Sequence, residues 1–474
     1  MDILSLIPQF GSLVWTIAAF ILALSVIVAI HEYGHYIVGR WSGIHADVFS
    51  IGFGPVLYSR IDKRGTRWQL AALPFGGYVK FAGDSNAASG KDSEAMAAVE
   101  NDPKRLRATM HGAPLWARTA TVAAGPVFNF VLSIIVFSLV MLSSGVSKDP
   151  LTVGDMRSLP VEADGLRAGD EILGINGGSL PSTEDQDNYR AFVDELPREP
   201  TLNYEVRRDG RVMEVEGPYM FPPLVNGLSP QSAAMRAGIE QGDVIVAIGG
   251  TPIYAFDQLK TAVEGGNGET LDLTIWRAGE TSDVALTPKR VDEPQDDGGF
   301  ETYWRIGIAG GLAFEPATEV PGIGEAITGG LQQTWRIIEG SISGLTHMIT
   351  GAISTCNLSG PIGIAQTSGA MASQGAQSFI WFIAVLSTAV GLLNLFPVPA
   401  LDGGHLVFYA YEAVAGKPPS DKALRVMMTF GLATVLTLML FALGNDIFCP
   451  CSAFFPKNLQ HAIFAPHFAQ IEPH

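Results

Sequence analysis

The chain alternates long apolar segments with polar stretches, and several of the apolar segments are long enough to cross a membrane. They cover approximately residues 13–30, 115–142, 379–396 and 424–443. A helix of about 20 apolar residues spans the hydrocarbon core of a bilayer. The pattern therefore predicts a polytopic α-helical membrane protein with about four transmembrane helices.

Between the first two of these segments, the chain becomes polar and takes on the pattern of strands. Residues 68–81 carry Gly76 and Gly77 in their middle, a pattern that favours a β-hairpin or the lip of a sheet. We therefore predict an N-terminal membrane domain at residues 1–142. It contains two spans, with a membrane-associated β-hairpin between them.

The polar region after the second span contains an internal repeat. The sequence GLRAGDEILGING of residues 165–177 returns as GIEQGDVIVAIGG at residues 238–250. Each copy combines glycine turns with a short alternating strand, and each is followed by an expected helix. The repeat predicts two inserted β-rich modules, at residues 143–220 and 221–291.

The remaining chain divides into three parts. Residues 292–375 are expected to form a linker, which starts in the acidic, glycine-bearing stretch 291–300, and then an amphipathic segment along the membrane surface. Residues 376–445 form a C-terminal membrane domain with the last two spans. Residues 446–474 form a tail.

Composition and charge fit a membrane core that carries soluble modules. Apolar residues make up 47% of the chain and charged residues 16%, with a mean hydropathy of +0.24. The formal net charge is -17, and residues 143–375 hold 33 acidic against 15 basic side chains. This balance excludes nucleic acid as a partner. Three cysteines, Cys356, Cys449 and Cys451, are too few for a disulfide framework or a cysteine zinc cluster.

The candidate chemistry lies in the first apolar segment, where His31, Glu32 and His35 interrupt the apolar run. Ionisable groups at membrane depth are costly, so they indicate function. His31 and His35 lie four residues apart on one face of a helix, where both can bind zinc. Glu32 can then act as general base. A chance match to this short motif is the alternative, and the membrane setting favours the metal site.

A second motif, NLFPVPALDGGH at residues 394–405, lies between the last two spans. Its prolines stop a helix and its glycines allow a tight turn, which predicts unwound backbone facing a cavity. Asp402 is then the third ligand of a zinc site with an open position. Without the two histidines, Asp402 would be interpreted as a turn residue. His405 is interpreted as a neighbour of the site or as turn packing, and Asn129 as a bond to another helix or part of the site.

The distribution of basic residues predicts the orientation in the membrane. The loops at residues 43–113 and 417–425 are comparatively basic, which places them in the cytoplasm. The spans then place both termini and the acidic modules outside.

With these residues assembled, the chain resembles the bacterial site-2 proteases of the regulator-of-sigma-E type, a family of zinc intramembrane metalloproteases. The resemblance rests on the two motifs above, on the tandem modules and on four shorter motifs: Gly52-Phe-Gly-Pro55, Gly76-Gly-Tyr-Val-Lys80, Ala124-Gly-Pro-x-x-Asn129 and Leu358-Ser-Gly-Pro361. The repeat itself resembles PDZ domains, which bind peptide termini by strand addition. Modules with occluded grooves are the alternative.

The resemblance implies one zinc ion per chain, held by His31, His35 and Asp402, with Glu32 as the base. It also implies two groups of substrate-binding residues. The first group would hold unwound substrate and consists of Asn394, Pro397 and Pro399. The second would offer a strand edge and consists of Gly76, Gly77 and Tyr78.

The implied function is zinc-dependent endoproteolysis of transmembrane segments in single-pass membrane proteins, such as anti-sigma factors, and of remnant signal peptides. The implied location is a bacterial inner membrane, with the PDZ-like modules and both termini in the periplasm. Two other classes stay open: a non-proteolytic PDZ receptor with a structural metal, and a metal transporter. A structural zinc site normally has four protein ligands, but only three are found, and a transporter gives the tandem modules no purpose.

Overall fold

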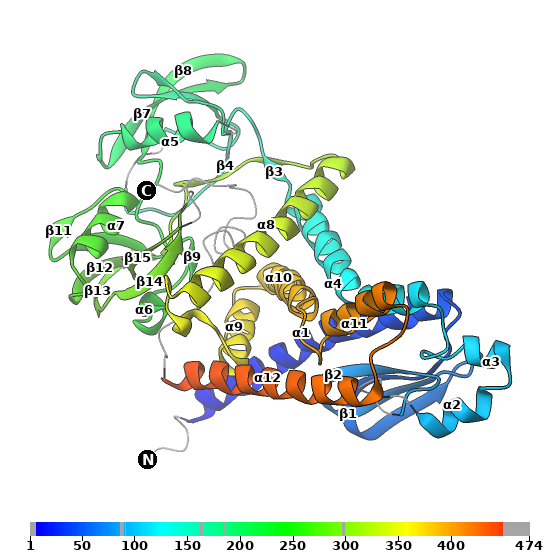
Figure 1. Cartoon of the computed structure of the whole chain (residues 1–474). Coiled ribbons are helices and arrows are strands. Elements are labelled where there is room, and N and C mark those ends of the chain that lie inside the picture. Colours follow the sequence, from blue (N-terminus) through cyan, green and yellow to red (C-terminus); the bar gives the residue numbers. More distant parts are fainter. Residues whose placement is uncertain are drawn as a thin grey trace. The chain divides into compact units, whose positions relative to one another are not determined.

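The computed structural model describes residues 6–448, apart from residues 86–89, 91, 162, 164, 184, 231 and 296–298. Within this range the chain forms two compact units, whose elements are labelled in Figure 1. The first unit comprises the chain up to Phe137 together with Gly330–Ile338 and Gly360–Phe448. The second unit comprises Ser138–Gly329 and Glu339–Ser359. Cys449 and Cys451 lie outside the described residues.

Four of the described helices are long and apolar enough to cross a membrane. They are α1 (Leu6–Trp41), α4 (Leu115–Ser144), α10 (Ala376–Asn394) and α12 (Asp421–Phe448). Large apolar side chains remain exposed on their surfaces, such as Phe430 of α12, which is 70% exposed. Such a surface suits lipid rather than water. The expected set of apolar helices is therefore confirmed.

The polar region after α1 forms an antiparallel sheet from β1 (Ala46–Ile61) and β2 (Arg67–Phe81). Residues 48–51 pair with residues 67–70 on one side and with residues 77–80 on the other. Residues 77–80 therefore lie at the margin of the sheet. Their second side pairs with no strand in the described part of the chain.

The turn of this sheet lies elsewhere than the sequence indicated. A hairpin within residues 68–81 is wrong, because the two halves of that stretch pair with β1 and not with each other. The tight turn starts instead at Asp62, whose carboxylate accepts a hydrogen bond from the Thr66 amide. The strand β1 was hidden in the sequence because Gly52 and Gly54, both with positive φ, give it the appearance of a turn.

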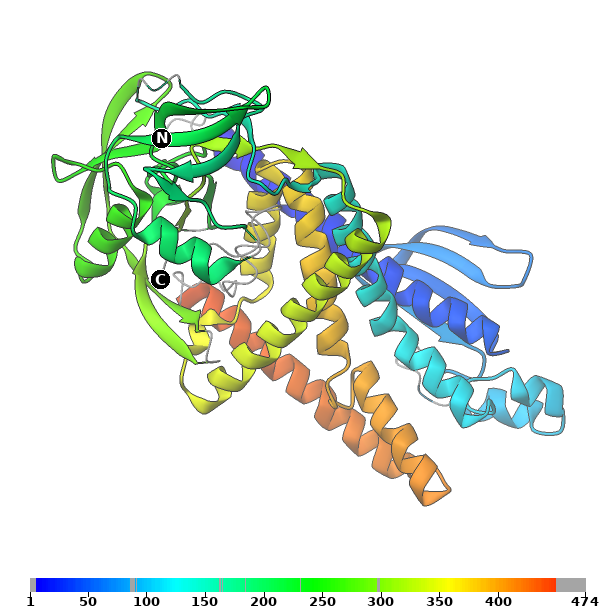
Figure 2. The ribbon, with the colours of Figure 1, turned by 90° about the horizontal axis from the view of Figure 1, so that it is seen from above.

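One face of the β1–β2 sheet packs against the C-terminal half of α1 (Figure 2). Tyr36 of α1, Phe49 of β1 and Val79 of β2 are all buried in this contact. The sheet is thereby fixed beside the turn of α1 that carries the polar motif.

In the second unit, the two copies of the repeat fold in the same way. In module 1, the order β6-β5-β7-β8 is built on β5 (Glu171–Ile175), β6 (Gly178–Ser179), β7 (Thr201–Arg208) and β8 (Arg211–Pro218). In module 2, the order β11-β10-β12-β13 is built on β10 (Val244–Ile248), β11 (Thr251–Pro252), β12 (Leu271–Arg277) and β13 (Glu280–Leu286). Each has its expected helix, α5 (Gln186–Asp194) or α7 (Phe256–Gly265).

The aspartate of the repeated Gly-Asp dipeptide has the same role in both modules. Asp170 accepts two hydrogen bonds from the Arg208 guanidinium, each of 2.6 Å, and Asp243 accepts two from that of Arg277, of 2.6 and 2.7 Å. Burial by itself would raise the pKa of Asp170, but the bonds from Arg208 and from the Arg167 amide hold it below its usual value. The repeated motif is therefore explained by the fold of the modules.

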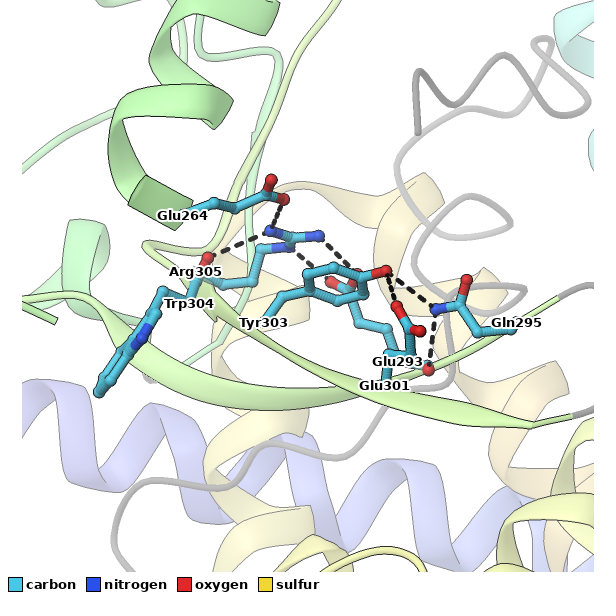
Figure 3. Close-up of polar contacts among 7 residues, drawn as sticks. All are labelled: Glu264, Glu293, Gln295, Glu301, Tyr303, Trp304 and Arg305. Atoms are coloured by element: carbon cyan, nitrogen blue, oxygen red, sulfur yellow. Dashed lines mark hydrogen bonds and ion pairs between the residues drawn. The ribbon is translucent and has the colours of Figure 1, made fainter. Parts of the chain in front are cut away.

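Residues 291–300, expected to be a linker, instead contribute to two paired strands, β14 (Lys289–Pro294) and β15 (Phe300–Arg305). The linker expectation is wrong because ion pairs stabilise this hairpin. Arg305 binds Glu293 of β14 and Glu264 of α7, as Figure 3 shows. Glu293 is buried, so removal of its partner would leave a charge without compensation.

After this hairpin, the chain runs back along both modules in three short strands, each paired with an earlier one. The pairs are β16 (Ile308–Ala309) with β9 (Gly227–Leu228), β17 (Phe314–Pro316) with β4 (Val153–Met156), and β18 (Thr318–Glu319) with β3 (Val146–Ser147). The return segment thus completes the modules. It also brings the start and the end of the whole insertion together, with the Lys148 amide 3.0 Å from the Ala317 carbonyl oxygen.

The remaining helices are α2 (Ser93–Val99), α3 (Pro103–Arg107), α6 (Ala233–Arg236), α8 (Ile323–Thr350), α9 (Pro361–Ser373) and α11 (Asp402–Ala415), and Thr355–Asn357 forms one 3₁₀ turn. The N-terminus of α9 is bound by Asp446 of α12, which accepts hydrogen bonds from the Gly360, Ile362 and Gly363 amides. A methyl group at Gly360 would lie 2.5 Å from that carboxylate. This close approach explains why the motif Leu358-Ser-Gly-Pro361 contains glycine.

Candidate active site

Three side chains from two helices converge in the first unit. Nε2 of His31 and Nε2 of His35 lie 3.1 Å apart, and Oδ2 of Asp402 lies 3.1 Å from the first and 3.5 Å from the second. A tetrahedral zinc ion with bonds of about 2.0–2.1 Å separates its ligand atoms by about 3.3 Å. In the described part of the chain, Oδ2 of Asp402 accepts no hydrogen bond although it is buried. The donor set therefore fits a tetrahedral cation with one position left open.

The helix α4 orients both imidazoles from behind. Nδ1 of His35 lies 2.9 Å from the carbonyl oxygen of Thr121, and Nδ1 of His31 lies 3.3 Å from the side-chain amide of Asn129. An imidazole that faces a metal through Nε2 carries its proton on Nδ1, so both neighbours must accept. Oδ1 of Asn129 is otherwise without a partner among the described residues, and a rotation of the amide places it on the His31 proton. Asn129 thus lies at the site.

Two glycines allow α1 and α4 to approach closely at this point. A methyl group added to Gly125 would lie 2.3 Å from Nε2 of His35 and 2.8 Å from Cε1 of His31. A methyl group added to Gly34 would lie 2.5 Å from the carbonyl oxygen of Ala124. Any larger residue at either position would separate the helices or displace the imidazoles.

Glu32 faces the margin of the β1–β2 sheet. Gly77 of β2 lies so close that a methyl group there would be 3.1 Å from Cγ of Glu32 and 2.9 Å from Val28. The carboxylate therefore lies between the metal ligands and the margin strand 77–80.

A cavity of about 240 Å³ contains these groups. Of the residues singled out in the sequence, its walls include His31, Glu32, His35, Gly77, Tyr78, Asn394, Asp402 and His405. Gly76, Pro397 and Pro399 are not among the described residues that line it. Apolar and aromatic residues complete the wall, among them Met110, Val122, Tyr409 and Met428. The sequence held no signal for these four, because apolar and aromatic residues are common throughout the chain.

The segment that carries the prolines contacts the start of α11 through its backbone. The irregular segment between α10 and α11 folds over the start of α11, so that a methyl group at Gly403 would lie 2.3 Å from the carbonyl oxygens of Leu395 and Phe396. A methyl group at Gly404 would lie 2.5 Å from Cα of Pro399. The glycine pair thus allows the sharp bend that places Asp402, the first residue of α11, beside the histidines.

Comparisons with known proteins find matches along most of the chain. The model of peptidase family M50 matches residues 19–438. The chain is 36% identical over 441 residues to an Agrobacterium fabrum protein named "Putative zinc metalloprotease Atu1380", which covers 92% of this chain and 97% of that protein. It is 32% identical over 466 residues to "Regulator of sigma-E protease RseP" of Escherichia coli, which covers 92% of this chain and 99% of that protein.

The close approach at Gly125 leads to a first prediction. In Gly125→Ala, the added methyl group displaces the imidazoles, so the affinity for zinc falls by about tenfold or more. Competition with a chelator on the purified protein measures this affinity. Gly444→Ala on α12 is the matched control, because a methyl group there meets no described atom within 4 Å. Equal affinity in Gly125→Ala and wild type would contradict the helix contact described here.

Proposed function

This chain belongs to peptidase family M50, and from that premise we propose that the cavity between α1, β2 and α11 is its active site. The protein is a zinc-dependent membrane protease, as its family and its similarity to zinc metalloproteases indicate. The resemblance found in the sequence is thereby confirmed, and a silent receptor or a metal transporter is not favoured. One observation carries the assignment of the site: two imidazole nitrogens and a carboxylate oxygen converge at 3.1–3.5 Å, with Glu32 in the same cavity.

His31, His35 and Asp402 would hold one zinc ion, and Glu32 would serve as general base. Zinc in such a site lowers the pKa of a bound water and polarises a carbonyl group. Glu32 then accepts the proton of the attacking water and delivers it to the leaving amine. Its place beside the three ligands and next to the margin strand suits both transfers.

Substrate would bind along the margin strand 77–80. A helical segment shields its carbonyl groups in internal hydrogen bonds, so it must unwind before hydrolysis. Strand addition next to Gly77 and Tyr78 replaces those bonds, and the Asn394 amide offers further ones from across the cavity. Gly76, Pro397 and Pro399, expected to bind substrate directly, would instead shape the backbone around it. The exposed apolar residues Leu57 and Tyr58 support an association of this sheet with the membrane.

The substrates would be transmembrane segments of single-pass membrane proteins. The similarity to a regulator of sigma-E protease supports anti-sigma factors as one class, with remnant signal peptides as a second. The two repeat modules would be PDZ-like domains with two roles, binding of peptide termini and exclusion of substrates that carry bulky external domains. Helix α8 would lie along the membrane surface through its exposed apolar residues, which include Ile327, Leu331 and Trp335.

The assignment of Glu32 predicts a separation of catalysis from metal binding. In Glu32→Gln the ligands survive and the base is lost, so cleavage of a model membrane substrate falls at least about 100-fold while zinc stays bound. In Asp402→Asn a neutral amide replaces a charged ligand, so zinc affinity and cleavage both fall. Zinc content and cleavage rate are measured on the same preparations.

Tyr33→Phe is the control for these variants, because Tyr33 adjoins Glu32 in the sequence but is 39% exposed. Cleavage by Glu32→Gln at a rate near that of Tyr33→Phe would exclude Glu32 as the base. Undiminished zinc affinity in Asp402→Asn would mean that the third ligand is another residue.

The orientation is also a proposal: both termini and the modules lie on the periplasmic side of a bacterial inner membrane, and the β1–β2 sheet lies in the cytoplasm. The basic loops at residues 43–113 and 417–425 support it. We expect an impermeant thiol reagent to label Thr281→Cys in intact cells but not Ser93→Cys, relative to the parent chain. The reverse pattern would overturn the orientation.

The exclusion role can be tested by removing the modules at the point where the start and the end of the insertion meet. Because the Lys148 amide bonds Ala317, residues 148–317 can be replaced by a short flexible linker without moving the chain ends. The excised variant should cleave a full-length substrate as fast as a pre-trimmed one, whereas the wild-type protein should prefer the trimmed form. A full preference for trimmed substrate in the excised variant would refute the exclusion role.

A further inference from the structure

Helix α11 begins with Asp402, and an ion pair to α4 holds its far end. Nη1 of Arg118 donates to Oε2 of Glu412 at 3.0 Å, and Nη2 donates to Oε1 at 2.6 Å. The two side chains are only 14% and 16% exposed. Nε of Arg118 also donates to the carbonyl oxygen of Ala113 at 3.0 Å. The guanidinium is therefore fixed on α4 and binds the carboxylate through both of its oxygens.

This pair lies on the face of α11 that carries the site. At about 100° per residue, Asp402, His405, Tyr409 and Glu412 fall within an arc of about 80° on the helix. The guanidinium of Arg118 also lies over the ring of Tyr409, 5.1 Å from its centroid, and that ring lines the cavity. The opposite side of the helix is exposed, with Val414 at 91%. The buried face therefore sets where α11 lies.

The same α4 orients the histidines through Thr121 and Asn129 and touches them at Gly125. It thus has contacts with both halves of the ligand set, the histidines on α1 and the carboxylate on α11. Within the described residues, Arg118 and Glu412 form the one ion pair between α4 and α11. The bend before α11 restrains the other end of that helix.

We propose that Arg118 and Glu412 are positioning residues that hold α11 on α4, so that Asp402 keeps its distance from His31 and His35. The proposal rests on the function assigned above. Neither residue touches the reacting atoms, because Glu412 lies ten residues, about 15 Å of helix, beyond Asp402. A planar, two-point contact restrains both the rotation of α11 and its distance from α4. A single-point contact to a lysine would restrain only the distance.

The test uses Glu412→Gln in the full-length protein. Loss of the carboxylate charge leaves Arg118 uncompensated and frees α11, so zinc affinity, measured by chelator competition, falls about tenfold. At saturating zinc, kcat for a model substrate falls by about the same factor while KM changes less than twofold, since the margin strand is untouched. Arg118→Lys, which keeps the charge but not the two-point contact, shows a smaller loss. Arg207→Gln is the matched control, because it breaks an exposed ion pair with Glu171 in module 1.

Zinc affinity is also measured in a Glu32→Gln background, where no cleavage contributes to the result. If Glu412→Gln lowers zinc affinity in that background, the result supports positioning. This conclusion does not depend on whether Glu32 is the base. Partial recovery of zinc affinity in the exchange variant, Arg118→Glu with Glu412→Arg, supports it further and excludes simple misfolding. Unchanged zinc affinity and kcat in Glu412→Gln would overturn the proposal, and so would an equal loss in Arg207→Gln.

Discussion

The close approach of α4 to α1 is the contact on which the site depends. Two imidazoles and a carboxylate that are largely buried need partners for their polar atoms, because a buried polar group without a hydrogen bond is costly. Gly34 and Gly125 bring the helices close enough for Thr121 and Asn129 to reach the far nitrogens of His35 and His31. The Nε2 atoms of both histidines then face Asp402. One packing contact thus determines how the imidazoles are oriented and which of their nitrogens carries the proton.

The unwound segment before α11 places a carboxylate from a distant part of the chain beside the two histidines. A continuous helix could not turn back sharply enough. Pro399 and the glycine pair 403–404 allow the backbone to fold over itself without side-chain collisions, and Asp402 emerges at the bend. The Arg118–Glu412 pair restrains the other end of α11, so the carboxylate is held from both directions.

The β1–β2 sheet and the repeat modules differ in the pairing of their marginal strands. Within the described chain, the sheet leaves one margin unpaired, whereas strands of the modules pair with the return segment. Among the residues that the structure describes, residues 77–80 pair with a strand on one side only, and Gly77 and Tyr78 line the cavity that also contains Glu32, where the proposed substrate would gain backbone hydrogen bonds. In the modules, β4 and β9 pair with the chain's own return strands, β17 and β16. A free margin thus occurs next to the catalytic cavity, whereas the return segment ties the modules into one closed insertion between Lys148 and Ala317.

The sequence by itself determined the features that depend on local spacing. These are the apolar spans, the pair His31 and His35 on one helical face, the internal repeat, and Asp402 as the partner of that pair. The tertiary structure decided the features that depend on partners distant in the chain. Among these are the turn at Asp62 and the strands that replace the expected linker at 291–300. The same holds for the exclusion of Pro397 from the cavity wall and for the pairing of Arg118 with Glu412. A hydrogen-bond or charge partner leaves no trace in the spacing of its own segment, because folding alone brings the two segments together.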